Sequence, residues 1–419
     1  MSYKHPKHPI HDYWKYDFHF SWILLIFGNM ISRIHENTLL KSLRKQPVCV
    51  IVGSRQVGKT TLAKKIASKL KKKSIYLDLE NPEDLAKLTN GYAYLTNHKD
   101  HCVIIDEVQQ LPILFTWLRP LIDAHRKPGR FLLLGSANPA LVSGVSESLA
   151  GRVAYHELPP VLFKEAISSK IKMTKHWFRG GYPSALTAKN EIAFYKWTGD
   201  FIKSYVERDL SKFFKVSFSS SQIRNFLLML AHAHGSIYNA SEFGRALGVS
   251  NHTAERYAEY LEAAFLIRKL PAWYVYAKKR LVKSPKIYIR DTGILHRLCN
   301  IPDQQSLPGY LQIGASWEGY AIEQIIHLLP ENYQAYYYRT HQGAECDLVL
   351  VTGIKPIACI EIKLSNMPVL SKGYYTCIDD LKTSHNFVIT PSSDHYALSK
   401  NIYACSLEEY IGKHLKKLK

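Results

Sequence analysis

Nine residues, GSRQVGKTT from Gly53 to Thr61, constrain the fold more than any other stretch of this 419-residue chain. They match the pattern G-x-x-x-x-G-K-[ST], follow an apolar run and open a helical pattern. Glycines in such a loop let backbone N–H groups surround phosphate oxygens, and the helix N-terminus adds its positive end. Lys59 is expected to reach the outer phosphates, and Thr60 to offer its hydroxyl group to Mg²⁺. The predicted ATP-binding residues are Gly53, Ser54, Gln56, Val57, Gly58, Lys59, Thr60 and Thr61.

A second run, CVIIDEVQQLP from Cys102 to Pro112, complements this loop. Its apolar residues lead to Asp106 and Glu107 at the C-terminal end of an expected strand, which is where ligands bind in parallel α/β sheets. Asp106 is expected to hold Mg²⁺, and Glu107 to orient and deprotonate the attacking water. The two runs together predict ATP hydrolysis, with Lys59 and Glu107 as catalytic residues.

Three further residues are candidates for the nucleotide site. Ser136 and Asn138, in GSAN after another apolar run, either report on the γ-phosphate or cap the next helix. Arg152 follows a glycine and is a candidate arginine finger for the site of a neighbouring subunit. That role requires several copies of the chain, so a homo-oligomer is expected.

Apolar runs of strand length alternate with helical patterns up to about residue 160. These runs are VCVIVGS, SIYLDLE, CVIIDE, RFLLLGSA and VAYHELP. Continuous apolar strands separated by helices indicate a parallel sheet that is covered on both faces.

The chain is strongly basic, with a formal charge of +20 at pH 7. Such an excess favours nucleic acid or an anionic membrane surface as the partner, and we favour DNA. The run FSWILLIFGNMI is shorter than the roughly 20 residues that a membrane helix needs, so a peripheral membrane contact is the weaker alternative. Seven scattered cysteines form no CxxC pair, which indicates neither a zinc site nor a disulfide framework and fits a cytoplasmic protein.

The segment from Asn239 to Leu270 fits a helix-turn-helix. Ser241 and Ser250 are the expected helix caps, and Gly248 lies in the turn. In this motif the second helix presents its N-terminal residues to bases in the major groove. The candidate base contacts are Asn251, His252, Thr253 and Arg256.

A basic and aromatic segment follows, with seven Lys or Arg and no acidic residue from Lys269 to Arg290. A β-hairpin wing with phosphate-facing side chains would have this composition. The candidate phosphate contacts are Lys278, Lys279 and Arg280. The alternative is a helical lid that only packs against the ATPase, and acidic residues on the second helix support it: Glu255, Glu259 and Glu262.

The last region carries the pattern of a metal-dependent nuclease of the restriction-endonuclease type. Glu361 and Lys363 form an E-x-K on one expected strand, and Asp347 lies on the preceding strand across a turn, TGIKP. Asp347 and Glu361 could hold Mg²⁺, Lys363 could activate water, and Glu318 on an upstream helix could complete the metal shell. The alternative is a nuclease-like fold whose acidic residues are vestigial or structural.

Several of these motifs occur in the order and spacing of a prokaryotic AAA-type ATPase family. The resemblance rests on GSRQVGKTT, IIDEVQQLP, LLLGSAN, SLAGRV, GGYP, VERDL, RLVKSPKIYIRDTGIL and ECDLVL…IEIK. It covers nearly everything after about Met30, so the preceding residues look like an extension or the result of a mis-called start codon. The resemblance implies an AAA-type P-loop ATPase with a C-terminal domain of unknown function. Members are generally described only as ATP-binding, so the resemblance informs the fold more than the function.

We therefore expect an α/β multidomain protein with an AAA-type parallel sheet, a winged helix-turn-helix and a restriction-endonuclease-like domain. The expected boundaries are 1–33 for an extension, 34–160 for the ATPase core, 161–221 for a helical lid or linker, 222–290 for the winged helix and 291–419 for the nuclease-like domain. The expected function is Mg²⁺-dependent ATP hydrolysis coupled to action on DNA. The alternative is an ATP-driven regulatory switch that binds a protein or membrane partner and has an inactive nuclease-like domain.

Overall fold

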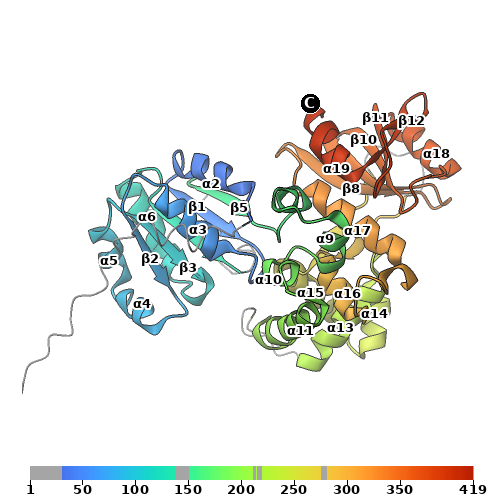
Figure 1. Ribbon diagram of the computed structural model, residues 1–419. Helices are drawn as coiled ribbons and strands as arrows, with labels where there is room; N and C mark the ends of the chain where they lie inside the picture. Colours follow the sequence, from blue (N-terminus) through green and yellow to red (C-terminus); the bar gives the residue numbers. More distant parts are fainter. Residues whose placement is uncertain (1–30, 137–150, 211–213, 215–218, 275–280, 419) are drawn as a thin grey trace, which may run out of the picture.

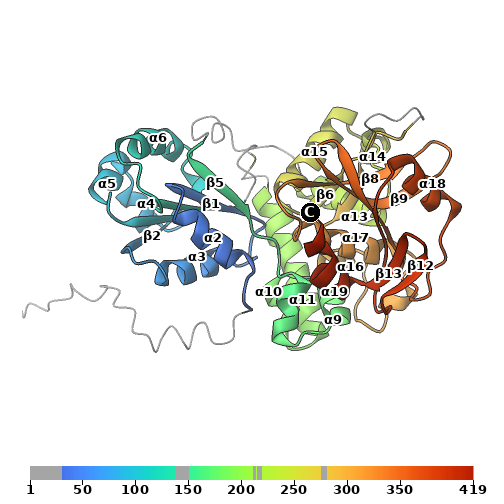
Figure 2. The ribbon, with the colours of Figure 1, turned by 90° about the horizontal axis from the view of Figure 1, so that it is seen from above.

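The computed structural model describes residues 31–136, 151–210, 214, 219–274 and 281–418 (Figure 1). Most of the expected N-terminal extension (1–33) and four candidate residues, Asn138, Lys278, Lys279 and Arg280, lie outside the described residues. The chain forms two lobes that lie side by side (Figure 2). The first lobe contains the expected ATPase core, and the second contains the chain from α8 (Phe163–Ala166) onward. No helix in the described parts of the chain is both long and apolar enough to cross a membrane.

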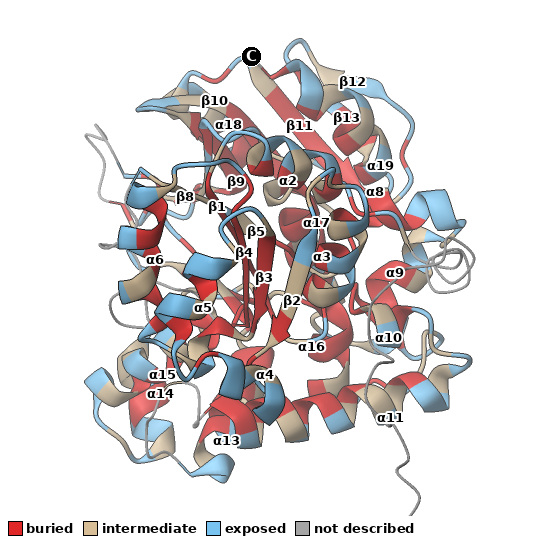
Figure 3. Ribbon diagram, turned by 90° about the vertical axis from the view of Figure 1, so that its left-hand side faces the viewer, coloured by how far each residue is buried: buried red, intermediate tan, exposed pale blue. Residues whose placement is uncertain are grey.

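The five predicted apolar runs form one parallel sheet in the first lobe. The strands are β1 (Val48–Val52), β2 (Ser74–Asp78), β3 (Cys102–Asp106), β4 (Phe131–Gly135) and β5 (Val153–Glu157). Their order is β2-β3-β4-β1-β5. The central strands β1, β3 and β4 are buried throughout, whereas the edge strands β2 and β5 are partly exposed (Figure 3).

Helices cover both faces of this sheet, as its continuous apolar strands predict. Successive strand residues point to opposite faces, so Cys49 packs in the same cluster as Leu62 while Val50 packs with Leu118. The helices of this lobe are α2 (His35–Leu43), α3 (Lys59–Ser68), α4 (Pro82–Lys87), α5 (Gly91–Asn97), the short η1 (Val108–Gln110) and α6 (Leu114–Ala124).

The second lobe begins with a helical part. Its elements are α8, η2 (Ile167–Ser169), α9 (Met173–Arg179), α10 (Pro183–Leu186), α11 (Glu191–Phe201), the π-helix η3 (Ile202–Asp209), α13 (Ser220–His232), α14 (Ala240–Leu247), α15 (Asn251–Ala263) and α16 (Thr292–Leu298). The antiparallel strands β6 (Ile267–Leu270) and β7 (Lys286–Ile289) follow α15. Because α16 packs mainly against α9 and α11, the helical part extends beyond the expected boundary at residue 291.

A mixed six-stranded sheet, ordered β12-β13-β11-β10-β9-β8, forms the rest of the second lobe. The helix α17 (Ile313–Ile326) covers one face, where Trp317 packs in the same cluster as Ile360, and α18 (Lys372–Leu381) covers the other, where Tyr374 packs with Cys359. The strands are β8 (Tyr333–Arg339), β9 (Glu345–Thr352), β10 (Lys355–Ile362), β11 (His385–Thr390), β12 (Tyr396–Ser399) and β13 (Ile402–Ser406). The remaining short helices are η4 (Leu307–Gly309), α19 (Leu407–Glu409), η5 (Tyr410–His414) and η6 (Leu415–Lys417).

Candidate functional site

The phosphate loop joins β1 to α3, as the sequence predicts. Gly53 has φ +153°, and a side chain there would come within 2.3 Å of the carbonyl oxygen of Leu158. Gly58 has φ +97° and directly precedes α3. Only glycine adopts both conformations without strain, which explains why the two positions carry it. The loop therefore directs its backbone and the N-terminus of α3 toward one cavity.

Lys59 lies at the centre of this loop and is only 5% exposed. Its Nζ donates to the carbonyl oxygens of Gly53, at 3.0 Å, and Ser54, at 2.9 Å, and to Ser136 Oγ at 3.0 Å. Burial lowers the pKa of Lys59 to about 8. An ammonium group held in this position is placed to neutralise phosphate charge.

Asp106 and Glu107 lie beside Lys59 at the end of β3. Thr60 Oγ1 donates to Asp106 Oδ2 at 2.6 Å, so the hydroxyl and carboxylate predicted to hold Mg²⁺ are in contact. Glu107 has φ +52°, which is uncommon for a residue other than glycine, and it accepts a hydrogen bond from Ser136 Oγ at 3.0 Å. Burial raises the pKa of Glu107. These residues fit a phosphate-bound Mg²⁺ and a base poised to take a proton from water.

Ser136 connects Lys59 and Glu107, the two side chains that are predicted to be catalytic. Its hydroxyl accepts from Lys59 and donates to Glu107, so β4 brings a polar group to the nucleotide site. Asn138, the other candidate from this strand end, lies outside the described residues. Arg152 directly precedes β5, the neighbour of β1, so it lies at the opposite end of these parallel strands from the loop, and it pairs with Asp123 at 2.8 Å. The structure thus gives Arg152 no place in the site of its own chain, and its role toward a neighbouring subunit remains a prediction.

A cavity of about 450 Å³ opens beside the phosphate loop, which is large enough for a small-molecule ligand. Predicted residues line it: Gln56, Val57, Gly58, Lys59, Thr60, Thr61 and Glu107. Residues that the sequence reasoning missed also line it: Ile31, Arg33, Glu36, Val161, Pro183, Ser184 and Thr187. The last three belong to the second lobe, next to the motif GGYP, so both lobes build the cavity.

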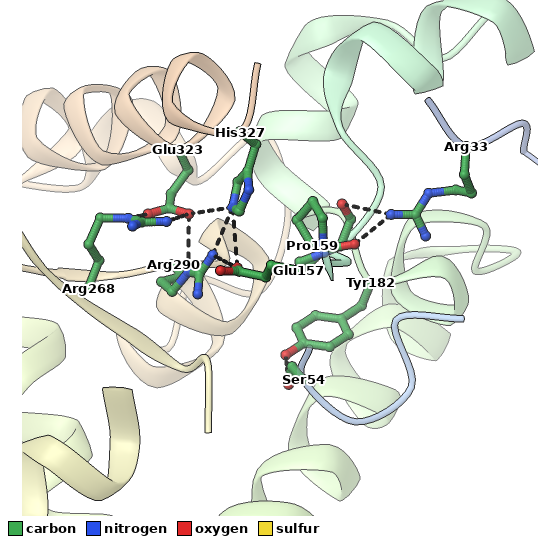
Figure 4. A network of polar contacts seen from close by, with 10 residues as sticks. Arg33, Ser54, Glu157, Pro159, Tyr182, Arg268, Arg290, Glu323 and His327 are labelled. Atoms are coloured by element: carbon green, nitrogen blue, oxygen red, sulfur yellow. Dashed lines mark hydrogen bonds and ion pairs between the residues drawn. The ribbon is translucent and has the colours of Figure 1, made fainter. Parts of the chain in front are cut away.

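The phosphate loop is bonded directly to the second lobe. Ser54 Oγ and Tyr182 Oη lie 2.6 Å apart (Figure 4). Arg55 forms ion pairs with Glu80 of its own lobe, at 2.8 Å, and with Asp209 at the end of the π-helix η3. Insertions of π-helix occur often at functional sites, because they shift side chains relative to an α-helix. Displacement of the loop by a nucleotide would therefore act on Tyr182 and Asp209.

Arg33 and Arg290 make two further bridges between the lobes (Figure 4). Arg33, before α2, pairs with Glu165 at 3.0 Å and donates to the carbonyl oxygens of Val57, at 2.8 Å, and Pro159, at 2.5 Å. Arg290, directly after β7, pairs with Glu157 at the end of β5 and with Glu323 of α17. Arg268 and His327 also pair with Glu323.

The predicted DNA-contact helix is present and its first turn is accessible. Asn251, His252 and Arg256 are exposed on α15, and Thr253 is partly exposed. Ser250 caps α15 as expected, because its Oγ accepts from Thr253 N at 3.1 Å. The expected cap of α14 is wrong: Asn239 caps it, and Ser241 lies inside the helix. Asn239 is also a good capping residue and comes earlier, which the sequence reasoning overlooked.

The basic segment is less available to phosphate than its sequence implies. Lys269 pairs with Glu255 of α15 at 2.5 Å, and Lys286 and Arg290 pair with acidic residues elsewhere in the chain. Three of the seven basic side chains are thus paired with acidic residues, Lys269 with the preceding helix and Lys286 and Arg290 with segments distant in the sequence. Lys278, Lys279 and Arg280 lie outside the described residues, so their role stays a prediction.

The candidate nuclease residues meet at the β9–β10 hairpin. Leu348 of β9 pairs with Ile360 of β10 in an antiparallel register. Asp347, which precedes Leu348, and Glu361, which follows Ile360, therefore stand opposite each other. Asp347 Oδ2 accepts from Ile362 N at 2.9 Å, and Lys363 Nζ lies 2.6 Å from Glu361 Oε1. Burial, reinforced by Asp347, raises the pKa of Glu361 to about 8. Burial, again reinforced by Asp347, raises the pKa of Glu318 to about 7.

A lysine that the sequence reasoning did not assign to this centre occupies it. Lys286 Nζ lies 3.0 Å from Glu318, 2.6 Å from Glu345 and 3.6 Å from Asp347. Burial alone would lower the pKa of Lys286, but the surrounding carboxylates, Glu318 first, hold it well above its usual value. Within the described residues, no group of three or more His, Cys, Asp or Glu is arranged to hold a metal ion. An ammonium group thus lies among the carboxylates, and the metal-binding role of Glu318, Asp347 and Glu361 stays a prediction.

Three family models match successive parts of the chain. A family described as "AAA domain" matches residues 45–167, and two domains of unknown function match residues 171–305 (DUF8612) and 313–410 (DUF4143). An uncharacterized protein of Mycobacterium tuberculosis is 37% identical over 373 residues, which cover 89% of this chain and 83% of that protein. The chain belongs to the family of that protein. Its first lobe is an AAA-type P-loop ATPase domain.

Two further proteins are similar to this chain at lower identity. An uncharacterized protein of Haemophilus influenzae is 26% identical over 299 residues, which cover 63% of this chain and 72% of that protein. A solved structure of a Walker-type ATPase from Pyrococcus abyssi is similar with a TM-score of 0.46 and 15% identity, covering 65% of this chain and 97% of that one.

Proposed function

We propose that this protein couples ATP hydrolysis in its first lobe to action on DNA by its second lobe, and that its C-terminal sheet is a nuclease-like domain. The observation that carries the proposal is the position of β7 and Arg290. Lys286 at the start of β7 reaches the carboxylates of the C-terminal sheet, and Arg290 at its end reaches Glu157 of the ATPase lobe. β7 and the arginine that follows it thus link the candidate nuclease residues to the ATPase lobe.

In this proposal, described residues of the first lobe carry out the main steps of ATP hydrolysis. Lys59 neutralises the outer phosphates, and Thr60 with Asp106 would hold Mg²⁺, which neutralises charge that develops on the phosphates. Glu107 takes a proton from the attacking water, and Ser136 fixes its carboxylate. Arg152 of a neighbouring subunit would complete this site in a homo-oligomer.

Contact with DNA is supported by charge and by exposure. The formal charge is +20, and the first turn of α15 presents Asn251, His252 and Arg256 to solvent. These residues would reach base edges, while Lys278, Lys279 and Arg280 would contact phosphates. In this arrangement β6 and β7 form the stem of a wing beside α15.

A second candidate function is an ATP-driven switch that binds a protein or membrane partner and whose nuclease-like domain is inactive. Lys286 favours this candidate, because it lies where a nuclease would place its metal. The two candidates differ in whether DNA binds and whether the carboxylates ever take a metal.

The experiment that tests the proposal is a salt titration of DNA binding with the full chain. We expect replacement of Lys278, Lys279 and Arg280 by Ala to flatten the slope of log K against log[salt] by about 0.9 for each phosphate that the protein no longer neutralises. The matched control replaces Lys71, Lys72 and Lys73 of the first lobe, which removes the same charge elsewhere and should change the slope much less. Equal slopes for both triple variants, or no DNA binding by the wild type, would support the switch instead.

A further inference from the structure

Lys286 is the most deeply buried lysine of the second lobe's described residues, at 3% exposed. Its Nζ is shared by carboxylates from two different elements: Glu318 of α17, and Glu345 and Asp347 of β9. Tyr288, two residues later on β7, also donates to Glu318 at 2.5 Å. The three carboxylates around Lys286 provide the oxygen-rich environment that hard divalent cations prefer.

Glu318, Glu345, Asp347 and Glu361 form a centre of four carboxylates, and their ion pairs among the described residues involve three cations, Lys286, Arg339 and Lys363. Glu345 has a second partner in Arg339 at 3.1 Å, and Glu361 has Lys363, but Glu318 and Asp347 share Lys286 as their cation. Glu361 is 5% exposed, and its Oε2 has no hydrogen-bond partner among the described residues. A buried carboxylate oxygen without a partner is costly, and it indicates that the centre can take a further ligand.

Lys286 does not belong to the elements that carry these carboxylates. It starts β7, whose other end leads to Arg290 and its ion pair with Glu157 of the ATPase lobe. Ile237 also bridges to Lys286 in the backbone, which ties β7 to the helical part. A shift of β7 along its own direction would therefore move Lys286 relative to Glu318 and Asp347.

We propose that Lys286 is the resident cation of the centre formed by Glu318, Asp347 and Glu361, and that a divalent metal binds there only when Lys286 is withdrawn or removed. This inference rests on the proposed nuclease-like domain. The Lys286 ammonium group and a divalent metal would compete for the same carboxylate oxygens. Two cations bound to the same carboxylates would also repel each other strongly in a buried site. The centre is thus closed to metal in the conformation that the structure shows, and β7 controls its opening.

The test is Mn²⁺ binding to the nucleotide-free full chain, measured by titration calorimetry. We expect Lys286→Met to gain one saturable Mn²⁺ site that binds at least tenfold tighter than any in the wild type. Lys283→Met, a replacement of an exposed lysine on the same segment, and Lys286→Arg, which keeps the charge, should behave as the wild type. Adding Asp347→Asn to Lys286→Met should remove the new site, which separates it from Mn²⁺ held at Asp106.

A second measurement, which compares Mn²⁺ binding by the wild type and Asp347→Asn, does not depend on whether Lys286→Met folds. Wild type and Asp347→Asn should give the same Mn²⁺ isotherm, because the wild-type centre binds no metal. A site present in the wild type and absent in Asp347→Asn overturns the proposal, as does equal Mn²⁺ binding by wild type and a folded Lys286→Met. If Lys286→Met gains Mn²⁺ but cleaves no DNA, the proposal about Lys286 holds and the nuclease function fails.

Discussion

The hydroxyl groups of Ser54 and Tyr182 lie 2.6 Å apart, and this contact joins the phosphate loop of one lobe to the other lobe. Arg55, the next residue of the loop, is paired with Asp209 of the π-helix η3. The predicted phosphate loop is therefore in contact with the second lobe at two successive residues. A nucleotide that reorders this loop changes the contacts between the lobes.

Removal of Lys59 or of the Glu107 carboxylate should stop ATP turnover in two different ways. We expect Lys59→Ala to abolish turnover and weaken ATP binding, because it removes the positive charge at the outer phosphates. Glu107→Gln should still bind ATP but hydrolyse it at less than about 1% of the wild-type rate, because an amide cannot act as base. Turnover and binding of a fluorescent ATP analogue measure the two effects. A wild-type rate in Glu107→Gln would remove Glu107 from the catalytic role.

Loss of the Tyr182 hydroxyl should uncouple the phosphate loop from the second lobe. Tyr182→Phe keeps the ring, which packs on Phe201 with centroids 4.7 Å apart, and should cost about 1 kcal/mol of unfolding free energy. We expect ATP turnover to fall severalfold as well, because Ser54 loses its partner. Tyr195→Phe is the matched control, since the Tyr195 hydroxyl accepts from Arg297 within the second lobe. The same loss of turnover in both variants would show a general effect of stability.

The raised pKa of Glu361 predicts a pH dependence of stability. Between its ordinary pKa of 4.5 and its folded value of about 8, the folded protein binds a proton that the unfolded chain has released. The stability contributed by this group is therefore fully present below about pH 4.5 and is lost as the pH rises toward 8. Glu361→Gln should lose less stability between pH 5 and pH 8.5 than the wild type, as measured by urea unfolding. Asp379→Asn, at an exposed position, should retain the wild-type pH dependence, and an unchanged profile in Glu361→Gln would contradict the assignment.

The ATPase sheet could be predicted from the sequence because each of its strands is a short apolar run bounded by a clear helical pattern. The phosphate loop and Asp106 follow from the same local signals. The hairpin that places Asp347 opposite Glu361 could also be predicted, because TGIKP is a short turn between two apolar runs.

The contribution of the second lobe to the nucleotide cavity could not be predicted. Pro183 and Thr187 are more than a hundred residues from the phosphate loop, and no local periodicity indicates that they meet it. Lys286 illustrates the same limit, because its sequence neighbours are basic and suggested a phosphate contact. Its acidic partners come from α17 and β9, which only the tertiary structure brings close.

ATP turnover by the full chain over a titration of duplex DNA is the most direct test of coupling between the two lobes. We predict a saturable rise in turnover that is absent in Glu107→Gln, and that requires higher DNA concentrations when Asn251 and Arg256 are replaced by Ala. Turnover that is abolished by Glu107→Gln but is the same at every DNA concentration would contradict the account.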